Sequence, residues 1–244
     1  MSTFPLSIVP RTIPGLRLWL DAADPSSITY SSNKVSQWRD KSGRGAHAAQ
    51  ATGANQPSTN TTTLAGKNVI AFSGTPVLMT FADNGILNIP VHIFIVAQRT
   101  NVSSGGEYYI LGRDASGAPI GTFDIVTEGA GNVKTQLKDG SGVNQFATNA
   151  ISSATPFIVH TKAVVGQNLT QDVNNGTPVT SGTNTVATTS DPSNTTGLGG
   201  RAANGLNGFV GFIAEILVYA ADITASNELI IKRYLTNKWG VAIA

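Results

Sequence analysis

The sequence predicts an all-β protein, an antiparallel sandwich of two sheets formed by one domain, with a single helix at its C-terminal end. Short apolar runs of strand length follow one another along most of the 244 residues, and turns separate them. Charged residues make up only 12% of the chain, and Gly, Ser, Thr, Asn and Ala take their place. This mixture favours strands and turns, because Ser, Thr and Asn compete with helical backbone hydrogen bonds and branched Thr fits a pleated surface.

The expected strands are recognised by alternation or by short runs that are apolar on both faces. Residues 16–21 alternate, with Leu16, Leu18 and Leu20 on one face. The segments 91–98 and 208–220 are apolar on both faces, as in the middle of a packed sheet. Further strands are expected within 67–74, 107–113, 121–128, 132–148, 157–165 and 169–179. Asp139-Gly140 and Asn175-Gly176 supply the hairpin turns of the segments 132–148 and 169–179.

Only the C-terminal segment has helical spacing. Thr224 is placed to cap the first turn and Gly240 to end the helix in a left-handed conformation. The positions that recur at helical spacing between them are Ile230, Ile231, Tyr234, Leu235 and Lys238. Residues 1–12 are expected to form an N-terminal arm, and residues 13–244 one domain without a linker or an internal repeat.

Composition excludes several classes of function. The net charge is +2 and the basic residues are scattered singly, so we expect no nucleic-acid partner. The chain has no cysteine, which excludes disulfides and thiolate zinc sites. The N-terminus lacks the basic start and apolar run of a signal peptide, and no apolar stretch reaches membrane-spanning length. We therefore expect a protein that folds in a cytoplasm and has no membrane partner.

One window, VSQWRDKSGRGAHA at residues 35–48, looks at first like an active site. Its Gly-x-Gly-x-x-Ala segment matches a dinucleotide-binding pattern, but no apolar strand precedes it and no helix follows. The window is therefore interpreted as a turn. Asp40 and Ser42 would bond nearby backbone, Gly43 and Gly45 would take positive φ, and Trp38 would pack into the core.

Patterns of nucleophilic or metal-assisted catalysis are missing from the sequence. No Gly-x-Ser-x-Gly elbow occurs. The three histidines, His47, His92 and His160, are far apart and belong to no metal-binding motif. We therefore expect each of them to be a surface or sheet residue rather than a metal ligand or a base.

Glycosidase chemistry requires two carboxyl groups on either side of a sugar bond. No two of the four glutamates share a strand at a spacing that places both on one face; they are Glu107, Glu128, Glu215 and Glu228. Asp114 and Asp124 remain a pair that neighbouring strands could bring together. Glu215 lies inside an apolar strand, where we expect a buried carboxylate that binds an Arg or backbone N–H groups.

Ligand-binding candidates are few. Oxygen ligands for calcium occur on expected loops at Asp83-Asn84, Asp114, Asp191 and Asn194, but no Asp-x-Asp-x-Asp run is present, so calcium stays possible without being established. No other cofactor is expected. The three tryptophans are expected in the core. Tyr108, Asp114 and Asn204 are the candidate residues for a ligand, since an outward Tyr could stack on a sugar ring.

Two end segments carry a resemblance to a known family. Residues 13–48, with LWLDA followed by VSQWRDKSGRG, and residues 208–241, with GFIAEILVY followed by a helix ending in YLTNKWG, resemble the laminin-G-like branch of the concanavalin A-like lectin/glucanase superfamily. The segment GKNVIAFSG is similar to the next strand of that family. The resemblance implies a jelly-roll of two curved antiparallel sheets, with a concave face and loops open to carbohydrate.

The resemblance does not imply catalysis, because the Glu-x-Asp-x-x-Glu strand of the glucanases is missing here. Related domains are frequent in phage structural proteins. We therefore expect a non-enzymatic virion surface protein, a capsid decoration or tail component, that binds host or environmental glycans. Its N-terminal arm would contact other virion proteins, and it would be a homo-oligomer or part of a larger assembly. The alternatives are a purely structural decoration subunit without a ligand and, with less support, a glycan hydrolase.

Overall fold

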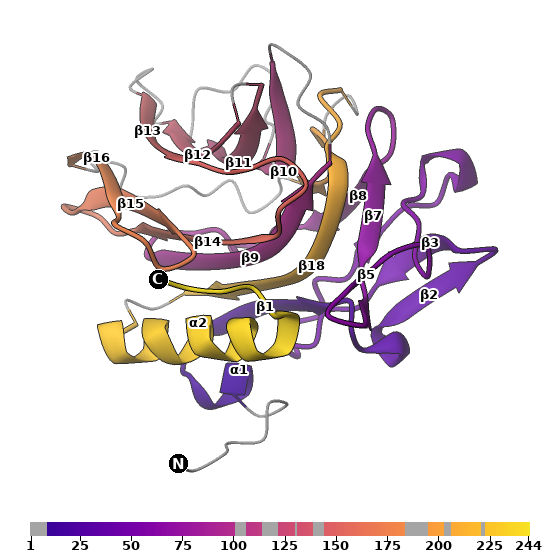
Figure 1. Cartoon of the computed structure of the whole chain (residues 1–244), viewed down its shortest axis with the longest axis horizontal. Helices are drawn as coiled ribbons and strands as arrows, with labels where there is room; N and C mark the ends of the chain where they lie inside the picture. The colour runs from indigo at the N-terminus through magenta and orange to yellow at the C-terminus, as the bar shows by residue number, and fades with distance from the viewer. Residues whose placement is uncertain are drawn as a thin grey trace.

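The computed structural model is a sandwich of two antiparallel sheets with one long helix on its outer side (Figure 1). It describes residues 9–100, 106–113, 122–129, 131–138, 144–183, 195–202, 206–220 and 223–244. The predicted all-β sandwich with a C-terminal helix is confirmed. In the described part of the chain, no helix is long and apolar enough to cross a membrane.

Among the described residues, the first sheet has seven strands, which pair in the order β1-β18-β9-β14-β15-β16, with β7 added at β18. Their bounds are β1 Leu16–Asp21, β7 Ile70–Ser73, β9 Val91–Arg99, β14 Phe157–Ala163, β15 Asn168–Val173, β16 Val179–Thr183 and β18 Val210–Tyr219. This sheet is curved, and helix α2, Ala225–Trp239, lies along its outer side (Figure 1). A short helix α1, Val9–Thr12, contacts α2.

In the described part of the chain, the second sheet has nine strands in the order β13-β12-β11-β10-β17-β8-β4-β3-β2. Their bounds are β2 Ile28–Ser31, β3 Lys34–Trp38, β4 Ala48–Ala49, β8 Met79–Ala82, β10 Glu107–Arg113, β11 Thr122–Glu128, β12 Asn132–Lys138, β13 Asn144–Ala150 and β17 Thr195–Leu198. A separate two-stranded ribbon joins β5, Thr63–Leu64, to β6, Lys67–Asn68. Two short 3-10 helices cover Pro25–Ser27 and Gly53–Asn55.

The two central strands of the first sheet, β9 and β18, are largely apolar on both faces because both faces are covered. Ile93 and Ile95 of β9 are fully buried on the face toward the second sheet, and Phe94 and Val96 are fully buried on the face toward α2. The tryptophans at 19, 38 and 239 are buried as predicted, with exposed fractions of 3%, 0% and 0%. The central strands therefore hold the core between the two sheets and a second apolar layer beneath the helix.

The turn at residues 39–47 has the predicted chemistry. Asp40 Oδ1 accepts hydrogen bonds from the backbone N–H groups of Trp19 at 3.0 Å and Ser42 at 2.8 Å, and Oδ2 accepts one from Ala46 at 3.2 Å. Gly43 and Gly45 have φ values of +95° and +77°. This window is a turn between β3 and β4, as interpreted from the sequence.

Helix α2 begins and ends as predicted. Thr224 Oγ1 accepts a hydrogen bond from the N–H of Asn227, and Gly240 ends α2 with φ +68°.

The hairpin turn after β15 lies one residue earlier than predicted. The left-handed residues there are Asn174 and Asn175, with φ values of 53° and 56°, so the predicted Asn175-Gly176 position is wrong by one. Asn adopts this conformation more often than most other non-glycine residues. The expected Asp139-Gly140 turn and most of the N-terminal arm lie outside the described residues.

Candidate functional sites

A buried polar cluster joins α2 to the first sheet. Glu215 Oε1 accepts hydrogen bonds from the Trp19 indole at 2.7 Å and the Tyr234 hydroxyl at 2.8 Å. Its Oε2 accepts from the Trp239 indole at 2.6 Å and lies 2.7 Å from the Lys238 ammonium. Burial of Glu215 is confirmed, but the expected Arg or backbone partners are wrong. Indole, phenol and ammonium groups satisfy it, because α2 covers that face of β18.

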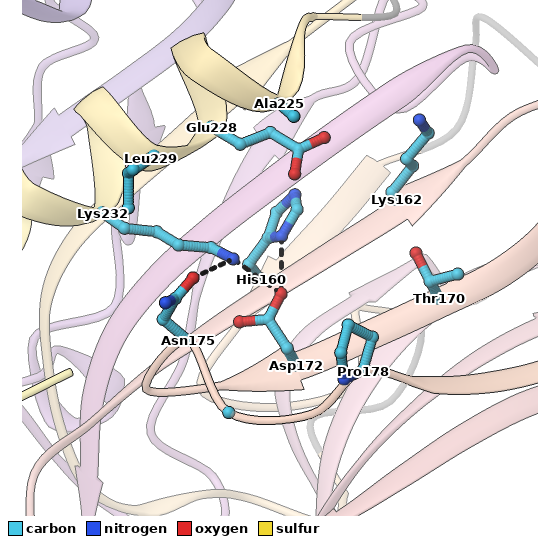
Figure 2. A pocket seen from close by; sticks show the side chains of 11 residues that line it. His160, Lys162, Thr170, Asp172, Asn175, Pro178, Ala225, Glu228, Leu229 and Lys232 are labelled. Carbon is cyan, nitrogen blue, oxygen red and sulfur yellow. Dashed lines mark hydrogen bonds and ion pairs between the residues drawn. The ribbon is translucent and has the colours of Figure 1, made fainter. Parts of the chain in front are cut away.

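A pocket opens beside this cluster, between the first half of α2, strands β14 and β15, and the turn that follows β15 (Figure 2). Its volume is about 410 Å³, within the range of small-ligand pockets. His160 comes from β14, Asp172 from β15, and Glu228 and Lys232 from α2. We call it the α2 pocket. Lys162, Thr170, Asn175 and Pro178 also line it.

Asp172 is the centre of charge in the α2 pocket. Its Oδ2 lies 2.9 Å from His160 Nδ1 and 2.8 Å from the Lys232 ammonium, which also donates to Asn175 at 3.2 Å (Figure 2). Burial acts to raise the pKa of Asp172, but the hydrogen bonds and charges of His160 and Lys232 hold that pKa below its usual value. Asp172 is therefore an ionised carboxylate that orients the His160 ring.

A second histidine lies on the other side of His160. His92 Nδ1, on β9, is 3.2 Å from His160 Nε2 and 3.6 Å from Glu228 Oε1. Both histidines are buried, and the Phe94 ring stacks on His160 with centroids 4.3 Å apart. Both lie in strands, as expected, but their position does not test the expectation that neither is a metal ligand or a base. The sequence did not reveal that they lie together, because 68 residues separate them and only the pairing of β9 with β14, which sets His160 opposite Phe94, brings them close.

Another polar group lies on the outer face of β10 to β13, the face of the second sheet that points away from the first. Glu107 and Glu128 face each other across β10 and β11. Lys134 forms ion pairs with both carboxylates, and Gln136 donates to Glu107 at 2.7 Å. Phe146 lies directly across from Gln136 and is 56% exposed. We call this surface the β10–β13 face.

The β10–β13 face contains a carboxylate pair that sequence spacing missed. Glu107 and Glu128 lie on different strands, so only the antiparallel register could bring them together. The two carboxylates raise the pKa of Lys134, although partial burial acts in the opposite direction, and Lys134 therefore stays an ammonium ion between them.

The other predicted site residues have mixed outcomes. Tyr108 is half-buried, and the Arg99 guanidinium lies 5.6 Å from the centre of its ring, so its position does not test a sugar contact. Asp83 is fully buried and accepts from the Leu87 N–H at 3.0 Å within its own turn. The candidates Asp114, Asp191, Asn194 and Asn204 lie outside the described residues.

No family model matches this chain, and no curated protein matches it in sequence. Solved structures do share its fold. The binding domain of botulinum neurotoxin serotype D is 13% identical, with a TM-score of 0.62 over 91% of this chain and 52% of that one. The binding domain of botulinum neurotoxin DC in complex with SialylT is 13% identical, with a TM-score of 0.63 and the same coverage. A Trypanosoma rangeli sialidase in complex with 2,3-difluorosialic acid is 16% identical, with a TM-score of 0.61 over 94% of this chain and 34% of that one.

These similarities show the fold, a sandwich of antiparallel β-sheets. This chain spans about half the length of the two neurotoxin binding domains and about a third of the sialidase. The predicted phage origin is not tested by them and stays a prediction.

Proposed function

We propose that the protein is a non-enzymatic, lectin-like domain that binds a glycan on the β10–β13 face. The observation that carries the proposal is the exposed Phe146 ring beside Gln136, in a sheet face that also holds Lys134 and two carboxylates. A sugar has an apolar C–H face and a rim of hydroxyls. An exposed aromatic ring can contact the apolar C–H face, and amide, ammonium and carboxylate groups can form hydrogen bonds with the hydroxyls.

The similar structures support the same class of ligand. One neurotoxin binding domain is in complex with SialylT, and the cell entry of botulinum neurotoxin type C depends on interaction with two ganglioside molecules. The sialidase structure holds a sialic acid derivative. Because this chain covers only part of each of these proteins, the support extends to glycan binding as a class and not to any one sugar.

Hydrolysis is the weaker alternative, despite the sialidase among the similar structures. A glycosidase needs one carboxyl group that carries a proton to the leaving oxygen. On the β10–β13 face, both carboxylates pair with the Lys134 ammonium. We therefore expect no release of reducing sugar from bacterial polysaccharides. Release that is lost in Glu107→Gln or Glu128→Gln would favour a hydrolase instead.

A glycan array followed by calorimetry with the best ligand tests the binding. We expect Phe146→Ala to weaken the affinity about tenfold, since an aromatic contact is worth about 1 kcal/mol or slightly more. Tyr30→Ala is the matched control, because Tyr30 is 49% exposed on β2, at the other end of the same sheet. If the array stays blank at high protein concentration, the result would favour the alternative of a purely structural subunit without a ligand. Equal loss in both variants would rule out the β10–β13 face.

The location of the protein is a separate proposal. The low charge and the family resemblance support a phage virion, with the domain displayed as a decoration or tail component, folded in the bacterial cytoplasm before assembly. Mass spectrometry of purified particles carrying this gene tests it, and detection only in the host lysate would contradict it. Cross-linking within the same particles would identify the proteins that the N-terminal residues contact.

A further inference from the structure

We propose that His92, His160 and Glu228 hold a divalent transition-metal ion of the zinc class at the base of the α2 pocket. One ligand atom from each of the three side chains lies within 4.8 Å of the other two. The three residues come from β9, β14 and α2, so the fold and not a local motif brings them together. This inference does not rest on the proposed glycan binding, which concerns the opposite sheet.

The distances fit a metal centre. Two imidazole nitrogens on one tetrahedral zinc ion, each at 2.0–2.1 Å, are about 3.3 Å apart. His92 Nδ1 and His160 Nε2 are 3.2 Å apart. Glu228 Oε1 lies 3.6 Å from His92 Nδ1, too far for a hydrogen bond but within ion-pair distance of a protonated ring. An ion between the three atoms accounts for both approaches.

Asp172 supports the site from the Nδ1 side of the His160 ring, away from the proposed ion. It binds Nδ1 of His160, which fixes the tautomer in which Nε2 offers its lone pair toward His92 and Glu228. A carboxylate behind a ligand histidine is the usual support for zinc. The second oxygen, Oδ1, is buried and has no hydrogen-bond partner in the part of the chain that the structure describes. A buried acceptor of this kind is usually bound by an ordered water molecule.

The donor set and the surroundings favour zinc over calcium. Two imidazole nitrogens and one carboxylate suit zinc, cobalt or nickel, whereas calcium takes six to eight oxygen atoms. Lys232 pairs with Asp172, which leaves the Glu228 charge to the ion. Three protein ligands leave a fourth position, and the α2 pocket, which His160 and Glu228 line, provides the room for a small ligand there.

The test uses the full chain without an affinity tag, stripped with a chelator and titrated with zinc or cobalt chloride. We expect one ion per chain by calorimetry, visible absorption bands of tetrahedral cobalt, and a higher melting temperature with metal. Glu228→Ala should weaken the affinity at least tenfold, and His160→Gln should abolish binding. Asp172→Asn, a change in a positioning residue, should weaken affinity 10- to 100-fold.

His47→Ala is the matched control, because His47 is an exposed histidine in the turn before β4. It should bind metal like the wild type. If His160→Gln does not fold, as judged by circular dichroism, Glu228→Ala decides, since Glu228 is partly exposed on the first half of α2. Wild-type protein without a tight site, or affinity unchanged in Glu228→Ala, would overturn the proposal. Glycan binding measured in chelator is expected to be unaffected, so the two proposals fail separately.

Discussion

At the scale of single residues, buried side chains around the 39–47 turn hold it in place. Trp38 ends β3 with its ring fully buried, and it pairs with Ile28 of β2 and Ala48 of β4. The polar residues that follow satisfy one another and the backbone. The window that resembles an active site in the sequence is thus a structural turn that holds three strands together.

We expect Trp38→Ala to lower the free energy of unfolding by about 3–5 kcal/mol, because the change leaves a cavity where a large aromatic ring was buried. Urea unfolding followed by fluorescence of the remaining tryptophans measures it. Tyr30→Ala, on the neighbouring strand but exposed, should change stability by less than about 0.5 kcal/mol. Unchanged stability in Trp38→Ala would mean that the ring has a role other than packing.

Glu215 is the second residue whose replacement has a defined effect. Burial and the Asp21 charge raise its pKa, while Lys238 acts in the opposite direction. We expect Glu215→Gln to cost about 3–5 kcal/mol in urea unfolding, because the amide nitrogen would face an indole or ammonium donor and Lys238 would lose a charge partner. Glu107→Gln, in the partly exposed ion pairs, should cost less than about 1 kcal/mol. Similar costs for the two would contradict this account of the cluster.

At the scale of elements, α2 is attached to the sheet by charges at two points along its length. Lys232 reaches Asp172 of β15 at 2.8 Å, and Lys238 reaches Asp21 of β1 at 2.6 Å. The helix therefore covers the outer face of strands that are distant in sequence. Its cap also positions the first turn, where Glu228 lies.

Thr224→Ala should lower the free energy of unfolding by about 1 kcal/mol, because the N–H of Asn227 loses its acceptor. Thr224→Ser keeps the hydroxyl and should be nearly neutral. Chemical unfolding curves of the three proteins measure both changes. Equal losses in the two variants would show that the threonine methyl group, and not the cap, is responsible.

Long apolar strands were predictable from the sequence, and strands of two residues were not. Strands β9 and β18 have nine and ten residues, so their apolar faces are unmistakable. Strands β4, β5 and β6 have two residues each, too few for any period to be visible. The displaced turn at Asn174 has a similar cause, since three consecutive residues there can all adopt turn conformations.

At the scale of the whole molecule, both candidate sites depend on strand register. His92 meets His160, and Glu107 meets Glu128, only after the sheets have formed. A register shift of one residue would turn each side chain to the opposite face. Composition and local pattern contain no information about such pairings, so the sequence predicted the sandwich while the clusters stayed hidden.

The response of the whole fold to acid follows from carboxylates that link separate elements. Asp24 lies 2.8 Å from Lys41 and accepts bonds from Ser26. Burial acts to raise the pKa of Asp24, but Lys41 and Ser26 hold it below its usual value. The pKa of Asp172 is lowered in the same way by His160 and Lys232. In both cases the unfolded chain binds a proton more readily than the folded protein does.

These two lowered pKa values therefore stabilise the fold above the unfolded pKa of about 3.9, and the contribution is lost as pH falls through the lower folded values. We expect the free energy of unfolding, measured with urea in the presence of a chelator, to decline below about pH 4. Asp24→Asn should make that decline shallower, by less than about 1 kcal/mol because the pair is near the surface. An acid limb that is identical in wild type and Asp24→Asn would show that the Asp24–Lys41 pair adds nothing to folding, whatever its geometry.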